Sequence, residues 1–195
     1  KPLHTGHAAE AGALAAMAAA KGVTGALEIL EGEVGFGAAM SINPDWSKAT
    51  RGLGTDYHIV HVTFKNHGCC GHTFPSIDGV LHLKHLHKFT HQDIKKVRLA
   101  TYKAGLDIIN NDKPEGEYQA KFSLQYTVAH ALVHGSVRLN AFSPERMQDT
   151  EVRALMQRIE CVADPELSKG YPGQRAAHVE IETVDGRKFT HFQPT

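Results

Sequence analysis

The sequence predicts an α+β protein in which a helical N-terminal segment precedes a two-layer domain with a mainly antiparallel sheet. Residues 1–56 contain helix signals followed by glycine-rich turns, whereas helix and strand patterns mix without regular βαβ spacing from residue 57 onward. The C-terminal residues also carry a β-hairpin pattern. We therefore expect one domain to end near residue 56 and a second to occupy residues 57–195.

The N-terminal segment begins with an alanine-rich helix over residues 5–21. Thr5 is suited to cap its start, and Gly22 stands where a left-handed residue ends a helix. Thr24 is suited to cap a second short helix that runs to about Glu31. The glycine-rich stretch that follows predicts a loop, and further turn-forming residues place the domain boundary after residue 56.

The second segment opens with a probable strand over residues 57–64 and a glycine-flanked turn, HGCCGH. Apolar spacing predicts a helix over residues 74–88 and a strand over residues 93–102. Residues 106–117 are expected to contain a loop.

Three helices and a strand are predicted before the hairpin: residues 118–134, a helix starting at Ser143-Pro144-Glu145, residues 150–158, and a strand at residues 159–162. Gly135 ends the first of these helices, and Pro144 suits a first helical position because its missing N–H has no partner there. A loop is expected over residues 164–175.

The hairpin is the clearest local pattern. From His178 to Thr183, charged or polar side chains alternate with inward-facing ones, as expected of a half-buried strand. Asp185 and Gly186 form a two-residue turn, and Lys188–Phe192 returns.

Composition excludes several classes of protein. The chain has 21 basic and 21 acidic residues, so no net positive field attracts nucleic acid or anionic lipid. No apolar run reaches the length of a membrane span, and His7 and Glu10 argue against a signal peptide. Cys69, Cys70 and Cys161 do not form a secreted disulfide framework, so we expect a cytoplasmic protein with reduced thiols.

The 14 histidines raise the alternative of a metal-binding protein. His82, His85, His87 and His91 cluster on or just after one predicted helix. HExxH and CxxC patterns are absent, so we interpret the cluster as a solvated face and expect no metal site. Dinucleotide, P-loop and nucleophile-elbow patterns are also absent, and no organic cofactor is expected.

The densest group of polar residues is KNHGCCGHTFPSID, residues 65–78. A helix that begins after His72 would point free N–H groups at the turn, and Lys65 would add a positive charge for a carboxylate. A thiol beside a helix start can be acidic enough to react. The spacing alone supports equally well a structural turn with buried cysteines.

Ser123, Tyr126 and His130 fall at three- and four-residue steps, so they share one face of a predicted helix. A tyrosine that faces a pocket can donate a proton or bind an oxyanion. Spacing by itself favours the other interpretation, a core helix whose tyrosine hydroxyl is bonded to a neighbour.

Three segments together resemble the MmgE/PrpD family in order and rough spacing. Residues 1–37 begin KPLHTG and resemble the family's K-P-x-H-x-G opening, with later Glu-Gly and Gly-Phe features. Residues 65–78 resemble its K-P-Y-P-C-C-R-H-T-H-type loop, and KFSLQYTVAHALVHG, residues 121–135, resembles its Ser-x-x-Tyr helix. The resemblance covers nearly the whole chain.

Family membership would imply a large all-helical domain, a smaller α+β lid domain, and an active site between them. Residues 1–56 would be the tail of the helical domain and residues 57–195 most of the lid. The family includes 2-methylcitrate dehydratase, cis-aconitate decarboxylase and iminodisuccinate epimerase. We therefore expect a cofactor-independent enzyme for a small polycarboxylate, working as a homodimer or together with a separate helical chain.

The resemblance also implies site residues. Two pocket lysines would bind carboxylates, a tyrosine would act as an acid or hydrogen-bond donor, and a thiol or imidazole would transfer a proton. The expected substrate-binding residues are Lys1, His4, Lys65 and Ser123, and the expected catalytic residues are Lys65, Cys70, His72 and Tyr126. The loop departs from the family where Asn66, His67 and Gly68 replace Pro-aromatic-Pro, a version that most resembles epimerase-like or uncharacterised members.

Dehydration, decarboxylation and epimerisation share one chemical difficulty, because each breaks a bond to carbon beside a carboxylate and leaves negative charge. The sequence predicts a lyase of the 2-methylcitrate dehydratase type, with an epimerase as an alternative. A non-catalytic subunit is a further alternative, since the family's upstream helical region is not represented.

Overall fold

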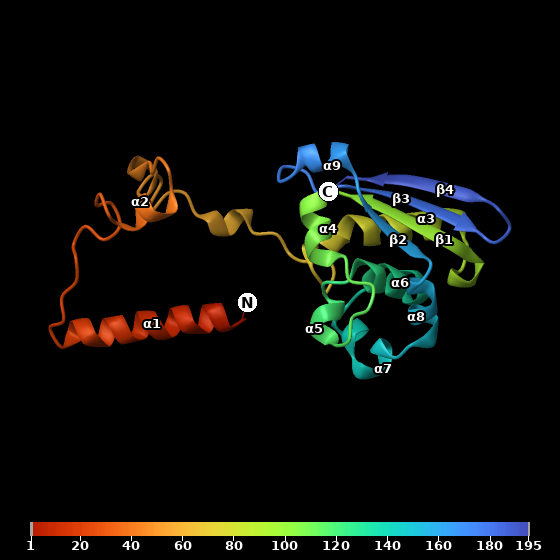
Figure 1. Cartoon of the computed structure of the whole chain (residues 1–195), viewed down its shortest axis with the longest axis horizontal. Coiled ribbons are helices and arrows are strands. Elements are labelled where there is room, and N and C mark those ends of the chain that lie inside the picture. Colours follow the sequence, from red (N-terminus) through yellow and green to blue (C-terminus); the bar gives the residue numbers. More distant parts are fainter. Residues whose placement is uncertain (1, 195) are drawn as a thin grey trace. The chain divides into compact units, whose positions relative to one another are not determined.

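The computed structural model describes residues 2–194, and the chain divides into two units between Val62 and Thr63. Figure 1 shows the helices and loops of the first unit and the sheet with its helices in the second.

The first unit contains helix α1 (Pro2–Ala20), helix α2 (Phe36–Met40) and short 3₁₀ helices at Trp46–Lys48 and His58–His61. Helix α1 confirms the predicted alanine-rich helix, which ends before Gly22 at φ +88°. The helix predicted from Thr24 to Glu31 is wrong, because that stretch forms turns. The glycine-rich stretch predicted as a loop instead contains α2.

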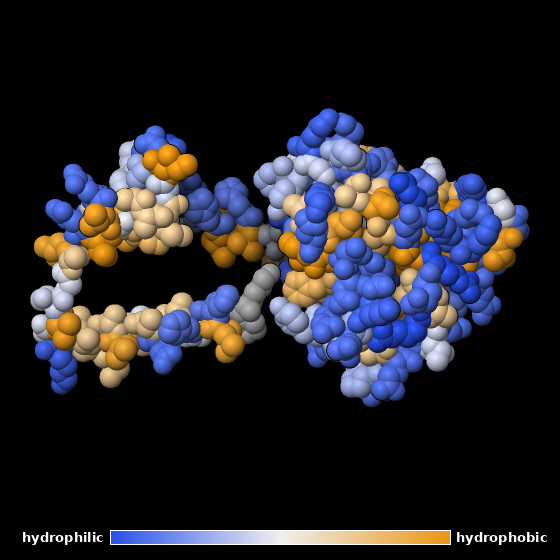
Figure 2. Space-filling model, in the orientation of Figure 1, coloured by the Kyte–Doolittle hydropathy of each residue, from blue (hydrophilic) through white to orange (hydrophobic). Residues whose placement is uncertain are grey.

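Side chains of the first unit pack little against one another. Among its described residues only Gly35 and Gly37 are buried, while Leu27 is 96% and Val34 98% exposed. Figure 2 shows apolar side chains on the surface of α1 and around α2. The described residues of this unit therefore form no hydrophobic core of their own.

The strand predicted over residues 57–64 is wrong. His58–His61 forms a 3₁₀ helix, and Ile59 and Val60 are each 73% exposed. Strand propensity reflects packing against neighbouring strands rather than an intrinsic backbone preference. No strand of the described chain pairs with this segment, so its β-branched residues do not form one.

The second unit is built on one four-stranded sheet in the order β2-β1-β3-β4. The strands are β1 (Ile94–Thr101), β2 (Ile159–Ala163), β3 (Ala177–Thr183) and β4 (Lys188–Gln193). Strands β1 and β2 are parallel, and the other two pairs are antiparallel. The predicted α+β class with a mainly antiparallel sheet is therefore confirmed. The C-terminal hairpin is also present, but its turn is one residue longer than predicted: the Thr183 N–H donates to the Arg187 carbonyl, so Val184 joins Asp185 and Gly186 in the loop.

Helices cover one face of this sheet (Figure 1). They are α3 (Phe74–His87), α6 (Leu124–His134) and, packed on α6, α8 (Thr150–Met156). Inward-facing residues of β1 and β3, such as Leu99 and Val179, are completely buried. A Cβ added at Gly79 of α3 would lie 2.7 Å from Val179 Cγ2, so a glycine is needed where the helix approaches the sheet.

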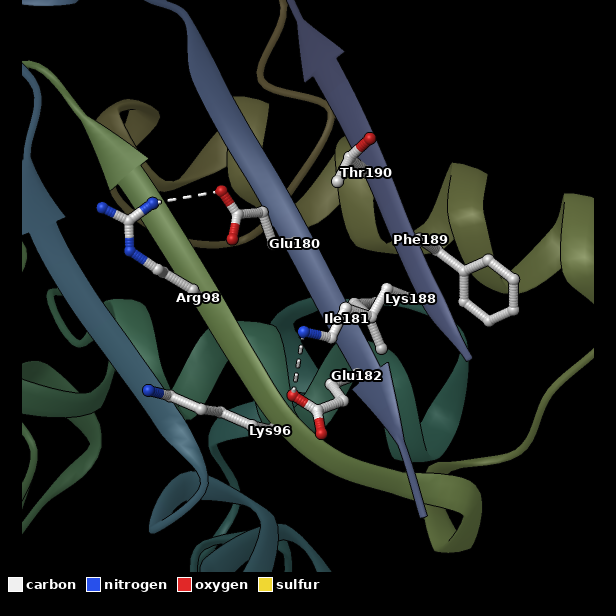
Figure 3. A pocket seen from close by; sticks show the side chains of 8 residues that line it. All are labelled: Lys96, Arg98, Glu180, Ile181, Glu182, Lys188, Phe189 and Thr190. Carbon is white, nitrogen blue, oxygen red and sulfur yellow. Dashed lines mark hydrogen bonds and ion pairs between the residues drawn. The ribbon is translucent and has the colours of Figure 1, made fainter. Parts of the chain in front are cut away.

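The opposite face of the sheet carries paired charges around a shallow pocket of about 180 Å³ (Figure 3). Lys96 Nζ lies 2.7 Å from Glu160, and Arg98 Nη1 lies 3.1 Å from Glu180. Each pair joins two neighbouring strands, and the two charges within it neutralise each other. The face is therefore charged but presents no field of a single sign.

The helix predicted over residues 118–134 is divided into α5 (Glu117–Ala120) and α6. Ser123 lies between them as the N-cap of α6, and its Oγ accepts a hydrogen bond from the Tyr126 backbone N–H at 3.0 Å. A serine that caps a helix cannot also lie in its interior, which explains the division. Gly135 ends α6 at φ +79°, as predicted.

Two further helices were not predicted. Helix α4 (Lys103–Ile109) precedes the loop expected within residues 106–117, and α9 (Pro165–Gly170) lies in a stretch predicted as a loop. Asp164 caps α9 by accepting hydrogen bonds from the next turn, and Pro165 is its first residue. This Asp-Pro start signal was present in the sequence. The helix α7 (Pro144–Met147) begins at Ser143 and Pro144 as predicted.

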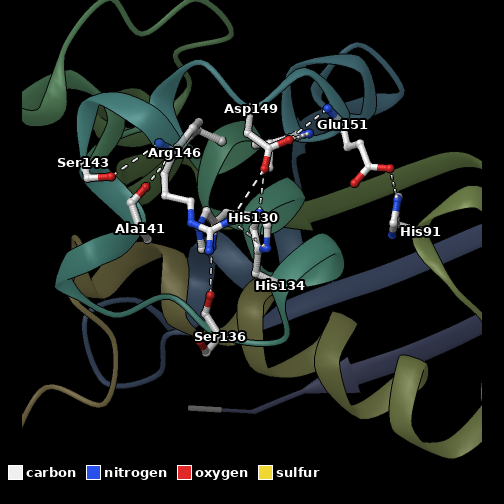
Figure 4. A network of polar contacts seen from close by, with 11 residues as sticks. His91, His130, His134, Ser136, Ala141, Ser143, Arg146, Asp149 and Glu151 are labelled. Carbon is white, nitrogen blue, oxygen red and sulfur yellow. Dashed lines mark hydrogen bonds and ion pairs between the residues drawn. The ribbon is translucent and has the colours of Figure 1, made fainter.

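A polar network fixes the end of α6 against α7 and α8 (Figure 4). His134 Nε2 donates to Asp149 Oδ2 at 2.8 Å, and Arg146 Nη1 lies 3.8 Å from the same oxygen. Partial burial raises the pKa of Asp149. Hydrogen bonds from the Val152 N–H and from His134 lower this pKa by more, so the net shift is downward. The carboxylate is therefore charged at neutral pH.

No described helix is both long and apolar enough to cross a membrane. Within residues 2–194, there is no group of three or more His, Cys, Asp or Glu side chains that could bind a metal ion.

Candidate active site at the start of helix α3

Three segments distant in sequence converge at one edge of the sheet. Helix α3 is joined to β1 by a short connection, so the two run antiparallel and the start of α3 lies beside the end of β1. Strand β3 is antiparallel to β1, with Ala177 opposite Thr101. The residues before β3 therefore reach the same edge. Figure 1 shows α4 and α9 at this edge.

His72, Tyr102 and Tyr171 form an aromatic cluster where these segments meet. The Tyr102 hydroxyl lies 2.5 Å from His72 Nδ1, and the two rings meet edge to face with centroids 5.6 Å apart. The Tyr171 ring stacks on Tyr102 at 4.9 Å with an interplanar angle of 14°. The cluster thereby fixes the imidazole against two aromatic rings.

A cation lies beside the same turn. A Cβ added at Gly71 would lie 3.8 Å from Nη1 of Arg175, so the guanidinium is next to the residue that precedes His72. Burial raises the pKa of Tyr102 to about 12, although the positive charge of Arg175 acts in the opposite direction. The Tyr102 hydroxyl is therefore protonated at neutral pH.

The two adjacent thiols lie in different environments. Cys69 is buried, and its Sγ lies 3.1 Å from the Thr73 hydroxyl. Burial raises the pKa of Cys69 to about 11, so this thiol stays protonated. Cys70 is only half-buried. Lys65 is exposed, and its Nζ lies 3.5 Å from the Cys69 carbonyl oxygen. Lys65, Cys70 and His72 are thus brought together on one loop.

A histidine that the sequence did not single out as functional anchors this loop. His67 is 7% exposed, its Nε2 lies 2.9 Å from Asp78 Oδ1, and its ring packs edge to face on Phe74. The loop is also bonded to a neighbouring segment, since the Gly68 N–H donates to the Val137 carbonyl at 2.9 Å. Its conformation is therefore set by contacts on both sides.

Replacing Asp78 by alanine is expected to lower the free energy of unfolding by about 1 kcal/mol, because buried His67 loses its partner while Asp78 itself is 41% exposed. Urea unfolding measures the loss. In a His67→Phe background the same replacement should cost less, since the contact is already gone. Equal losses in both backgrounds would show that the pair does not interact.

Ser123 and Tyr126 occupy the core of the second unit. The Tyr126 side chain is 0% exposed, and its hydroxyl donates to the Ala141 carbonyl at 2.5 Å. The Ser123 hydroxyl donates to the Asn111 carbonyl at 2.5 Å. Burial raises the pKa of Tyr126 to about 12. Both polar groups serve as structural hydrogen-bonding groups here, and their roles toward a substrate stay predictions.

His130, which shares their helix, is 3% exposed and lies 2.9 Å through Nδ1 from the Ser136 carbonyl oxygen. The carbonyl can only accept, so Nδ1 carries the proton. Burial lowers the pKa of His130, and the ring is neutral at neutral pH. Ser123, Tyr126 and His130 therefore lie close together as predicted, but their side chains face the core.

The two N-terminal site residues belong to the first unit. Lys1 lies outside the described residues. His4 is an exposed residue of α1. Their predicted contacts with a substrate stay predictions.

Sequence reasoning missed Tyr102, Tyr171 and Arg175. Tyr102 directly follows β1 and precedes α4. A tyrosine at the end of a strand could have indicated a site residue, because its hydroxyl is polar. Tyr171 and Arg175 lie in a stretch predicted as a featureless loop, and only the antiparallel pairing of β3 with β1 brings them to the site.

Sequence comparisons with known proteins indicate the family of this chain. The family model of the MmgE/PrpD C-terminal domain matches residues 67–194. A mitochondrial 2-methylcitrate dehydratase from Yarrowia lipolytica is 33% identical over 109 residues, which cover 53% of this chain and 21% of that protein. The 2-methylcitrate dehydratase of Salmonella typhimurium is 32% identical over 105 residues, which cover 51% and 22%.

A cis-aconitate decarboxylase from Mus musculus aligns over 207 positions at 26% identity, covering 100% of this chain and 41% of the mouse protein. The chain thus spans less than half the length of each of these relatives. The domain match includes most of the candidate loop and every element of the sheet. On that match, the chain belongs to the MmgE/PrpD family.

Proposed function

We propose that this chain supplies the C-terminal part of a lyase that acts on a small polycarboxylic acid and breaks a bond beside a carboxylate. The observation that carries the proposal is the convergence of Lys65, His72 and Arg175 around the start of α3. The names of the relatives support the substrate class, because 2-methylcitrate and cis-aconitate are both tricarboxylic acids.

Positive side chains suit this chemistry for two reasons. They hold a polycarboxylate in one orientation, which aligns the bond that breaks. They also stabilise the negative charge that develops on carbon and spreads into the neighbouring carboxylate. Lys65 provides such a charge on the loop, and Arg175 provides one beside Gly71.

Proton transfer is the second requirement, because a C–H bond breaks and a leaving hydroxyl or a carbanion takes up a proton. Cys70 and His72 are the titratable side chains of the loop that are partly accessible. We assign them as candidates for that transfer and Lys65 to carboxylate binding. Lys1 and His4 stay in the proposal as further substrate contacts from the helical region.

Proton NMR in D₂O with 2-methylcitrate, citrate, cis-aconitate and substituted succinates tests the reaction. New vinylic signals from a hydroxy acid would identify a dehydratase, and loss of a carboxylate from cis-aconitate would identify a decarboxylase. Each product should form at least about tenfold more slowly in a Lys65→Ala variant. Turnover that is unaffected by replacing Lys65 or His72 would overturn the proposal.

The same experiment addresses the alternative of an epimerase. Exchange of an α-proton for deuterium, without a new unsaturated product, would indicate epimerisation. The replacement of Pro-aromatic-Pro by Asn66, His67 and Gly68 is the feature that favours this alternative.

A further inference from the structure

The contact between Tyr102 and His72 has a defined direction. The Tyr102 side chain is 0% exposed, and its hydroxyl lies 2.5 Å from His72 Nδ1. Within residues 2–194, His72 is the hydrogen-bond partner of this hydroxyl. Leaving a buried hydroxyl proton without an acceptor is energetically unfavourable. Tyr102 therefore donates its proton to Nδ1.

This direction sets the tautomer of the imidazole. A neutral histidine carries one proton on its two ring nitrogens, so an Nδ1 that accepts a hydrogen bond leaves the proton on Nε2. Burial holds the hydroxyl in its protonated form, with the pKa of Tyr102 raised to about 12. The donor is therefore available across the neutral pH range.

The tyrosine is held rigidly enough for this role. Its ring stacks on Tyr171 at 4.9 Å, and a Cβ added at Gly105 would lie 2.7 Å from Tyr102 Cε2. Stacking on one side and the close approach of α4 on the other leave little freedom to the ring. His72 lies in a single turn, Gly71–Thr73, that leads directly into α3.

We propose that Tyr102 is a positioning residue that keeps the His72 proton on Nε2, so that His72 meets a substrate oxygen as a hydrogen-bond donor rather than as a base. This role rests on the proposed function, in which a carboxylate or hydroxyl oxygen of the substrate faces the loop. It also gives His72 a task different from that of Cys70, the other proton-transfer candidate on the loop. His72 donates to oxygen, and removal of a carbon-bound proton is left to another group.

Long-range ¹H–¹⁵N correlation of histidine-labelled protein tests the tautomer directly, without substrate. A His72→Gln variant identifies the His72 signals among the 14 histidines. The expected result is a hydrogen-bonded, unprotonated Nδ1 and a protonated Nε2. A protonated Nδ1 in the neutral ring would overturn the proposal, and this readout requires no variant of Tyr102.

Tyr102→Phe keeps the stacked ring and removes only the hydroxyl. We expect the Nδ1 signal to shift toward the average of a mixture of tautomers and kcat/KM to fall about tenfold. Tyr118→Phe is the matched control, because Tyr118 is 59% exposed on α5 and is expected to leave the His72 signals unchanged. An unchanged tautomer in folded Tyr102→Phe would refute the role of Tyr102.

The two measurements separate this inference from the proposed function. The expected tautomer in a protein that converts no polycarboxylate would leave the inference standing and the function refuted. A working lyase with the opposite tautomer would refute the inference alone.

Discussion

Replacing Lys65 by alanine is expected to lower kcat/KM for the polycarboxylate at least about tenfold, which corresponds to about 1.4 kcal/mol of transition-state stabilisation. Lys65 is exposed, with its Nζ only 3.5 Å from the Cys69 carbonyl oxygen. It is therefore available to a carboxylate at little structural cost. Steady-state kinetics on the substrate identified by NMR provide the measurement.

Two matched variants sharpen this prediction. Lys65→Arg keeps the charge and should retain more activity than alanine, although a guanidinium binds with a different geometry. Lys113→Ala removes another exposed lysine from a distant loop and should leave kcat/KM unchanged. Equal losses in Lys65→Ala and Lys113→Ala would point to a general charge effect and contradict carboxylate binding by Lys65.

A fragment containing only residues 63–195 is expected to unfold cooperatively, with the urea midpoint and slope of the 195-residue chain. The slope follows the surface exposed on unfolding, and the first unit buries almost no side chains of its own. Residues 1–62 alone should show a weak, non-cooperative helical signal, because most helical stability in proteins comes from tertiary packing and the side chains of α1 are exposed. Circular dichroism during urea titration measures both.

A core variant provides the control for the fragment. Ile77→Ala removes a completely buried side chain of α3 and should cost about 2–5 kcal/mol in the fragment and in the 195-residue chain alike. A much lower midpoint for the fragment than for the 195-residue chain would show that residues 1–62 contribute to the stability of the second unit.

The exposed apolar side chains of the first unit have a direct physical consequence. Leu27, Val34 and Ile42 are more than nine-tenths exposed, which is unfavourable in water unless other protein surface covers them. The relatives extend well beyond the matched region. We propose that, in an enzyme of the relatives' length, further helical residues cover these side chains.

Local patterns predicted the elements of the second unit that carry strong short-range signals. The hairpin at Asp185-Gly186, the helix α3 and the strand β1 appear where alternation, capping and turn residues placed them. The predicted secondary structure is wrong where the conformation depends on contacts that the local pattern does not contain. The segment at His58–His61 lacks a neighbouring strand, and Ser123 begins a helix instead of continuing one.

The candidate site shows the same division. The sequence alone predicted the KNHGCCGH loop, with Lys65, Cys70 and His72 as candidate site residues, because their spacing is local and resembles one family. Tertiary structure decided that Tyr102, Tyr171 and Arg175 join this loop and that the Tyr126 hydroxyl donates to Ala141. The physical reason is that strand pairing and helix packing bring together residues about 15 to 100 positions apart, and no local pattern records which of them will meet.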